Sequence, residues 1–208
     1  MTPIIVVVVV ATASGYILLF VFSVFALLWL NYWMTSMHTS VNGCKFCDIV
    51  KNKKELHLKD KNVCTVINDI KPKAKHHFLV LSKQHISKST DLTVADVPLL
   101  EEMERTGREL LREKLKKEGE ADTVEDMLRI GFHLPPLVSV HHLHMHIIYP
   151  ISDMGLISRK LTFRPGKVFK PVRELIDQLK DDAGVPNPLE GNPAKDDLHD
   201  KIPAQAIT

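Results

Sequence analysis

Residues 140–150 read VHHLHMHIIYP, and three of the histidines, His142, His144 and His146, alternate with apolar residues. Successive side chains of a strand point to opposite faces, whereas two helical residues two positions apart lie on nearly opposite sides. The spacing therefore predicts a strand with three imidazoles on one face and apolar core residues on the other. An imidazole is costly in a dry interior unless both ring nitrogens find partners. One core histidine repeated by chance is the alternative, but three on one face indicate nucleophilic, acid–base or metal chemistry.

Residues 3–30 contain no charged side chain. Because about 20 apolar helical residues span a hydrocarbon core of about 30 Å, we predict one transmembrane helix as an anchor within residues 1–34. The aromatic residues at positions 29–33 fall where an interfacial belt belongs. A cleaved signal peptide fits less well, since no basic segment precedes the apolar run and the run is too long. A buried core helix would carry a polar face, which this segment lacks.

Charge and cysteine content indicate where the rest of the chain resides. Lysine and arginine are absent before the predicted span and frequent after it, which places the following domain in the cytosol. Three cysteines, an odd count, argue against a disulfide framework and agree with that placement. A net charge of +2 gives no footprint for nucleic-acid binding. We therefore expect a single-pass membrane protein with a cytoplasmic domain and no nucleic-acid partner.

Residues 43–181 carry the pattern of one α+β domain, a size that the 208-residue chain allows beside an appendage. Apolar periodicity and turn residues predict strands over 62–69, 76–82, 127–130 and 142–148, and helices over 44–52, 96–115 and 171–180. The segment GFHLPP before the histidine strand is expected to be a loop. One antiparallel sheet with packed helices is the simplest architecture for these elements. Residues 182–208 are rich in Pro, Asp and Gly, and we expect a disordered tail.

Four segments occur in the order and approximate spacing of a known family. They are CKFC at 44–47, NDIKP at 68–72, HHFLVLSKQHIS at 76–87 and HLHMHII at 142–148. The last matches His-φ-His-φ-His-φ-φ, with φ apolar, and the chain resembles the histidine triad superfamily, most of all its Hint branch. The resemblance implies a HIT-like α+β fold, a homodimer and a purine nucleotide substrate. It also implies a hydrolase or transferase that acts at an α-phosphorus through a nucleotidyl-histidine intermediate.

The resemblance assigns roles to individual residues. His144 would be the nucleophile, because a neutral imidazole nitrogen can attack phosphorus and leave again. His146 would lie beside the scissile bond, and Ser139 would supply a hydroxyl there. Three further residues match the family's nucleotide site, namely the active-site histidine His77, the ribose-binding carboxylate Asp69 and the base-pocket residue Ile70. Asp69 could instead begin a turn, and Ser139 could cap the segment before the strand.

The CxxC pair, Cys44 and Cys47, has a spacing common in zinc sites, but two ligands do not close a tetrahedral site. His85 and His142 resemble the third and fourth ligands of zinc-bearing members of the superfamily. The resemblance thus implies a structural Cys₂His₂ zinc site, with no metal required for the chemistry. Two buried thiols that pack as small apolar side chains are the alternative. A redox pair is disfavoured, since no thioredoxin-like βαβ pattern surrounds it.

The segment GFHLPP at 131–136 departs from the family, in which many Hint members carry an Asn and a Gly-rich stretch. Its two prolines lack backbone N–H groups and cannot form the same amide cradle, which bears on leaving-group preference. No zinc-finger cysteines follow the triad, which disfavours the DNA-repair branch of the superfamily.

We expect an enzyme, a hydrolase that releases AMP from adenosine phosphoramidates or acyl-adenylates. One alternative is a membrane-tethered nucleotide-binding or scaffold protein with vestigial catalysis. Another is a dinucleotide or cap hydrolase of the same superfamily, which would cleave phosphate anhydrides faster than P–N bonds.

Overall fold

The computed structural model describes residues 40–120 and 122–185. The predicted anchor, residues 1–34, lies outside these ranges, as does the predicted tail from residue 186 onward. Within the described ranges, none of the helices has the length and apolar character needed to cross a membrane.

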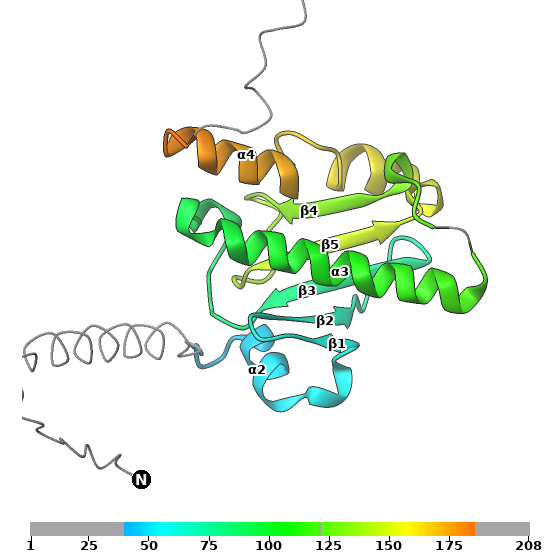
Figure 1. Cartoon of the computed structure of the whole chain (residues 1–208), viewed down its shortest axis with the longest axis horizontal. Helices are drawn as coiled ribbons and strands as arrows, with labels where there is room; N and C mark the ends of the chain where they lie inside the picture. Colours follow the sequence, from blue (N-terminus) through cyan, green and yellow to red (C-terminus); the bar gives the residue numbers. More distant parts are fainter. Residues whose placement is uncertain (1–39, 121, 186–208) are drawn as a thin grey trace, which may run out of the picture. The chain divides into compact units, whose positions relative to one another are not determined.

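The described chain folds into α-helices and the strands of one sheet, with the long helix α3 between the first three strands and the last three (Figure 1). The α-helices are α2 (Lys45–Asn52), α3 (Val97–Glu118) and α4 (Val172–Asp182). The strands are β1 (Lys59–Asp60), β2 (Cys64–Asn68), β3 (His76–Ser82), β4 (Arg129–His133), β5 (His144–Tyr149) and β6 (Phe169–Pro171). Single 3₁₀ turns cover Lys54–Leu56, Ser89–Asp91, Val94–Asp96, Glu125–Met127 and Ile151–Asp153, and a π-helical turn covers Ser158–Thr162.

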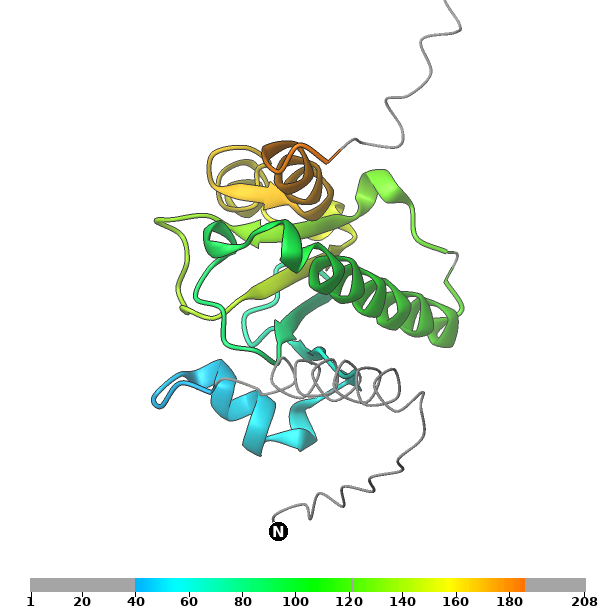
Figure 2. The same cartoon turned by 60° about the vertical axis from the view of Figure 1, so that its left-hand side comes forward.

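The six strands form one antiparallel sheet in the order β1-β2-β3-β5-β4-β6. Helix α3 crosses one face of the sheet, and α2 lies against the opposite face, as the two views together show (Figures 1 and 2). This arrangement confirms the predicted α+β fold with one antiparallel sheet and packed helices. Strand β5 lies between β3 and β4, so the histidine strand is flanked by backbone partners on both sides.

The alternation along β5 divides its residues between the two faces of the sheet. Met145 and Ile147 are fully buried in the main core beneath α3, together with Leu143 just before the strand. His144 and His146 point to the other face, as the period of two predicts. Helix α3 approaches the sheet closely at Gly107, because a Cβ there would lie only 1.8 Å from Ile147 Cδ1. Burial of the apolar face against α3 thus fixes which way the histidines point.

The start of α3 differs in detail from the prediction. Asp96 is the first residue of the predicted helix 96–115, but it lies just before α3, and its carboxylate makes no cap to the helix backbone. It instead accepts hydrogen bonds from the backbone N–H (2.8 Å) and hydroxyl (3.0 Å) of Thr93, because a 3₁₀ turn comes directly before α3.

The prediction that GFHLPP is a loop was wrong for its first half. Gly131, Phe132 and His133 belong to β4, and only the residues from Leu134 onward form the loop. Strand β4 pairs with β5 on one side and with β6 on the other. Because Gly131 is paired on both sides and Phe132 and His133 are paired with β6, this segment stays extended despite its glycine.

Candidate functional site

Four imidazoles gather on the face of the sheet opposite α3. His144 and His146 come from β5, His77 from β3, and His133 from the end of β4. The ring centroid of His146 lies 5.2 Å from that of His144, 5.3 Å from that of His77 and 4.7 Å from that of His133. The β3–β5 register sets Leu79 opposite His146 and His77 opposite Ile148. Residues 77 and 146 therefore share a face and lie diagonally across the strand pair.

Hydrogen bonds assign the proton positions on His77 and His146. The backbone N–H of Lys73 donates to His77 Nδ1 at 3.1 Å, so the proton of a neutral His77 sits on Nε2. That Nε2–H lies 3.0 Å from His146 Nδ1, which must then act as acceptor. The proton of His146 is consequently on its Nε2, a buried atom with no hydrogen-bond partner among the described residues. His146 thus holds a donor that is free for a bound molecule.

His144 carries its proton on the other ring nitrogen, Nδ1. Its Nδ1 lies 2.6 Å from the backbone carbonyl of His142 and donates its proton there. The lone pair of a neutral His144 is therefore on Nε2. The site presents an imidazole lone pair on His144 beside an imidazole N–H on His146, the pair that a nucleophile and a hydrogen-bond donor require.

Burial keeps these imidazoles neutral. Loss of hydration lowers the pKa of His77 to about 4 and the pKa of His146 well below its ordinary value. The pKa values of His144 and His133 are lowered for the same reason. Neighbouring imidazoles lower the pKa of His146 further, because a second positive charge nearby is unfavourable. At neutral pH His144 is thus in the form that carries a lone pair.

An apolar wall closes one side of the histidine cluster. Phe163 lies 4.6 Å from His133 and 5.3 Å from His146 between ring centroids, and it packs with the fully buried Phe169. Phe163 follows the π-helical turn, and Phe169 begins β6. Aromatic edges against the imidazoles exclude water from this side, which strengthens electrostatic interactions within the cluster.

The structure brings some predicted site residues together and leaves others apart. Asp69 Oδ2 lies 3.3 Å from His77 Nε2, which joins the carboxylate to the histidine cluster. Asp69 also begins a turn, since its Oδ1 accepts the backbone N–H of Lys71 at 2.7 Å. Ile70 is 91% exposed, and Ser139 is exposed as well. The nucleotide-site roles of these residues stay predictions.

His133 is a member of the cluster that sequence reasoning missed. The segment containing it was interpreted as a loop, so no direction was assigned to its side chain. Gly131 pairs with His146, and His133 lies two residues further along β4 on the same face. The alternation in RIGFH, read as a strand, was the signal that could have found it.

The four predicted metal ligands form a second cluster, at one end of the histidine strand. Cys44 and Cys47 flank the start of α2, His85 follows β3, and His142 precedes β5. Their ligand atoms all lie within 4.8 Å of one another. His142 Nδ1 lies 3.5 Å from both sulfurs, and His85 Nδ1 lies 3.3 Å from Cys47 Sγ.

These distances suit a tetrahedral zinc ion. Zn–S bonds of about 2.3 Å and Zn–N bonds of about 2.0 Å at tetrahedral angles separate S and N by about 3.5 Å. His142 Nε2 donates to the backbone carbonyl of Ser82 at 2.8 Å, which leaves the Nδ1 lone pair directed at the thiols. Such a bond to a carbonyl is the usual support of a metal-bound histidine. The cluster could therefore hold a zinc ion.

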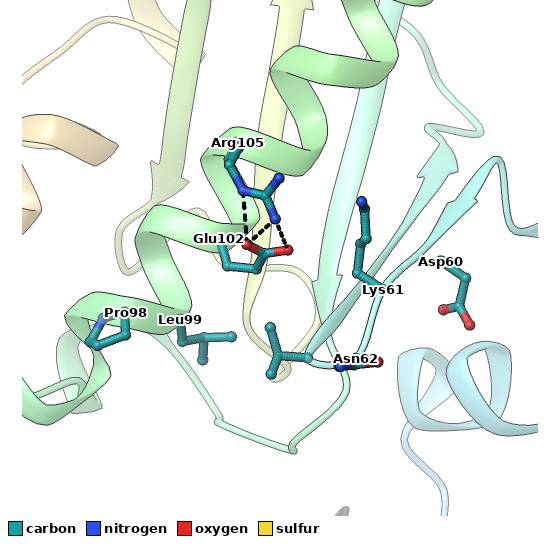
Figure 3. A pocket seen from close by; sticks show the side chains of 8 residues that line it. Asp60, Lys61, Asn62, Pro98, Leu99, Glu102 and Arg105 are labelled. Atoms are coloured by element: carbon teal, nitrogen blue, oxygen red, sulfur yellow. Dashed lines mark hydrogen bonds and ion pairs between the residues drawn. The ribbon is translucent and has the colours of Figure 1, made fainter.

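A sizeable surface pocket lies away from both clusters (Figure 3). Its volume is about 580 Å³, and it lies between the turn after β1 and the first half of α3. Asp60, Lys61, Glu102 and Arg105 are among its lining residues, with Glu102 and Arg105 paired to each other. No histidine or cysteine lines it. We therefore place the candidate active site at the histidine face of the sheet and not in this pocket.

Comparisons with known proteins agree with this geometry. A protein-family model described as "Scavenger mRNA decapping enzyme C-term binding" matches residues 43–162, more than half of the chain. The chain therefore belongs to the histidine triad superfamily, the class that the fold and the histidine strand define.

Individual relatives give a finer picture. An adenosine 5'-monophosphoramidase HINT3 from Xenopus tropicalis is 36% identical over 69% of this chain and 91% of its own length. A protein of the same name from Mus musculus is 30% identical over 67% of this chain and 82% of its own length. A histidine triad protein of solved structure from Clostridium difficile is 21% identical, covers 53% of this chain and 93% of its own, and has a TM-score of 0.44. The assignment rests on the sequence matches and not on this structural likeness.

Proposed function

We propose that the protein is a nucleoside phosphoramidate hydrolase that releases AMP from adenosine phosphoramidates or acyl-adenylates. The observation that carries the proposal is the pairing of two neutral imidazoles that carry their protons on different ring nitrogens. His144 presents a lone pair at Nε2, and His146 presents an N–H at Nε2. The relatives described as adenosine 5'-monophosphoramidases support this choice of substrate class.

The first half of the reaction uses His144 as the nucleophile. Its Nε2 attacks the α-phosphorus and forms a P–N bond while the bond from phosphorus to the leaving nitrogen breaks. The negative phosphate raises the pKa of the imidazoles around it, so the complex takes up one proton and His146 becomes an imidazolium. His146 Nε2 then gives its proton to the leaving nitrogen, which departs as a neutral amine.

The second half regenerates the enzyme. Water attacks phosphorus from the side that the amine has left, and the now neutral His146 takes one proton from that water. The bond between His144 and phosphorus breaks, AMP leaves, His144 regains its lone pair, and His146 releases the proton it took from water to solvent and is neutral again. In the resting enzyme His77 Nε2 donates to His146 Nδ1 across 3.0 Å and orients the ring. When His146 is an imidazolium its Nδ1 is protonated, and the Nε2–H of His77 donates to Asp69 Oδ2, 3.3 Å away, instead. In this proposal Asp69 and Ile70 bind ribose and base, and Ser139 approaches the leaving group when substrate is bound.

The Cys44, Cys47, His85 and His142 cluster has a structural part in this proposal. When bound there, zinc would cross-link α2 to the segments that follow β3 and precede β5, and it would supply no step of the reaction. Two of its ligands come from the segments that flank β3 and β5. Holding these segments together keeps His144 in register with His77.

Two further expectations accompany the enzymatic proposal. We propose that residues 1–34 anchor the chain in a membrane with the catalytic domain in the cytosol, an idea supported by the uncharged N-terminal segment. We also propose a homodimer, which rests on the family resemblance alone.

AMP release from adenosine 5'-phosphoramidate by the full-length chain in detergent tests the proposal. We expect His144→Ala to lower turnover by about 10⁴-fold or more, because removal of a nucleophile costs at least that much. The matched control is His141→Ala, which removes an exposed histidine next to the strand. Wild-type enzyme quenched without acid should carry an AMP-sized adduct on His144.

The other outcomes separate the alternatives. Turnover that survives in His144→Ala would reject the nucleotidyl-histidine mechanism. A folded wild-type chain that binds AMP without turnover would instead favour a tethered nucleotide-binding protein. Faster cleavage of a phosphate anhydride, such as a dinucleoside polyphosphate or an mRNA cap analogue, would favour the activity named by the matching family model.

A further inference from the structure

His76 is a buried histidine outside both clusters. Its ring lies between Phe78 and Tyr149, with centroid distances of 6.1 and 6.5 Å, and its side chain is only 5% exposed. Its Nε2 is buried and has no hydrogen-bond partner among the described residues. That nitrogen lies 3.7 Å from a carboxylate oxygen of Glu118. A buried nitrogen left unpaired normally costs stability, so its environment requires an explanation.

The nitrogen points at two carboxylates at the end of α3. Glu118 is the last residue of the helix, and Gly119 follows as its C-cap with φ of 73°. This left-handed conformation turns the chain so that Glu120 comes back beside Glu118. The ligand atoms of His76, Glu118 and Glu120 all lie within 4.8 Å of one another. The C-terminal end of a helix also carries a partial negative charge, which favours a cation there.

We propose that His76, Glu118 and Glu120 form a binding site for a divalent transition-metal ion of the zinc type. One imidazole nitrogen and two carboxylate oxygens are a ligand set that such ions accept, with water in the remaining position. The aromatic neighbours hold the ring of His76 in place, so its nitrogen is oriented before the ion arrives. The two carboxylates are about two-fifths exposed, which gives the ion a route from solvent.

The side chain of Lys75 already places a positive charge beside the two carboxylates. Its ammonium group lies 2.8 Å from Glu118 and also contacts Glu120. Its side chain is 48% exposed, so it can swing into solvent when an ion binds. Lys75 is thus an internal competitor for the site. The metal would replace it as the link between the end of α3 and the start of β3, the strand that carries His77.

Zinc binding by the full-length chain in detergent tests the proposal. The protein is dialysed against chelator-buffered free Zn²⁺ at a series of concentrations, and bound zinc is measured by atomic emission. The Cys₂His₂ cluster should fill first, because thiolates are the stronger zinc ligands. We expect a second, weaker step that is lost in His76→Gln and in Glu120→Gln. The Glu120 change is at the surface, so it keeps the test valid if His76→Gln does not fold.

Removal of the competing ammonium gives the sharper test. We expect Lys75→Met to move the weaker step to about tenfold lower free Zn²⁺, since the ion no longer displaces a bound cation. Lys117→Met is the matched control, because it removes an exposed charge from the same helix end without a contact to Glu118 or Glu120 among the described ion pairs. The absence of the weaker step, its persistence in Glu120→Gln, or equal shifts in the two lysine variants would overturn the proposal.

Discussion

Replacing Gly131 with alanine tests whether the close packing of β6 against β4 stabilises the face of the sheet that carries the histidines. A Cβ at this position would lie 2.2 Å from the backbone oxygen of Lys170, 2.8 Å from Phe169 Cε1 and 2.9 Å from Pro171 Cα. Contacts below 3.0 Å are not tolerated, so the Cβ-to-oxygen distance must grow by at least 0.8 Å. The nearest obstacle is backbone and not the end of a flexible side chain. Gly131→Ala therefore has to push β6 away from β4.

The expected loss of stability follows from three contributions. Overpacking in a dense region costs about 1–3 kcal/mol. Weakening one or two hydrogen bonds between β4 and β6 adds about 1 kcal/mol for each bond. Replacing glycine returns up to about 1 kcal/mol, because the unfolded chain loses freedom. The net expectation is a decrease of about 2–3 kcal/mol in the free energy of unfolding.

Urea unfolding of the full-length chain in detergent, followed by near-ultraviolet circular dichroism, measures this effect. Gly155→Ala is the control, since a Cβ at the exposed Gly155 meets nothing within 4 Å. The control should stay within about 0.5 kcal/mol of the wild type. Gly131→Ala should also slow AMP release, because Phe169 of β6 packs against His133 and His146. If both glycine variants match the wild type in stability, the close approach of β6 to β4 is not present in solution.

Three further predictions concern acid stability, zinc and the membrane. Burial lowers the pKa of His77 to about 4, so between about pH 6.5 and pH 4 the unfolded state binds a proton that the folded state does not, and His77 by itself should lower the free energy of unfolding by about 3 kcal/mol across this window. The lowered pKa values of His133, His144 and His146 act in the same direction. Urea midpoints measured from pH 7 to pH 4 check this, and a flat profile would contradict it. Cys47→Ser should remove the tighter zinc step and lower the thermal midpoint, as a chelator should in the wild type, and a zinc-free protein with unchanged stability would argue against the Cys₂His₂ site. Carbonate extraction should leave the full-length chain in the membrane pellet and release a chain lacking residues 1–34, whereas release of the intact chain would refute the anchor.

Local pattern was sufficient for much of the fold. The period of two along residues 142–148 predicted a strand with three histidines on one face. Strand β5 has this arrangement for His144 and His146, whereas His142 lies before the strand. The helical spacing after Asp96 predicted the apolar face of α3, which is buried against the sheet. Both features depend on the side-chain periodicity of one helix or one strand, which can be recognised in consecutive residues of the sequence.

Contacts between strands could not be obtained in this way. GFHLPP was interpreted as a loop because its glycine and prolines are turn residues, yet its first three residues are extended, since all three pair with β6 and Gly131 also pairs with β5. His133 was missed for that reason. The orientation of β6 depends on a three-residue strand that has no periodicity of its own to detect.

The sequence by itself determined which residue types are available and which side of its own strand each one occupies. It contained the proposed nucleophile His144, the neighbour His146 and the four candidate zinc ligands, because their spacings are local or match a family pattern. Only the tertiary structure decided that His77 meets His146, since a shift of one residue in the β3–β5 register would move His77 to the other face. The tertiary structure also decided which ring nitrogens of His77 and His144 carry a proton, because these depend on the backbone N–H of Lys73 and the carbonyl of His142. The same holds for His76, whose carboxylate neighbours are more than forty residues away along the chain and reach it only because α3 ends beside the start of β3.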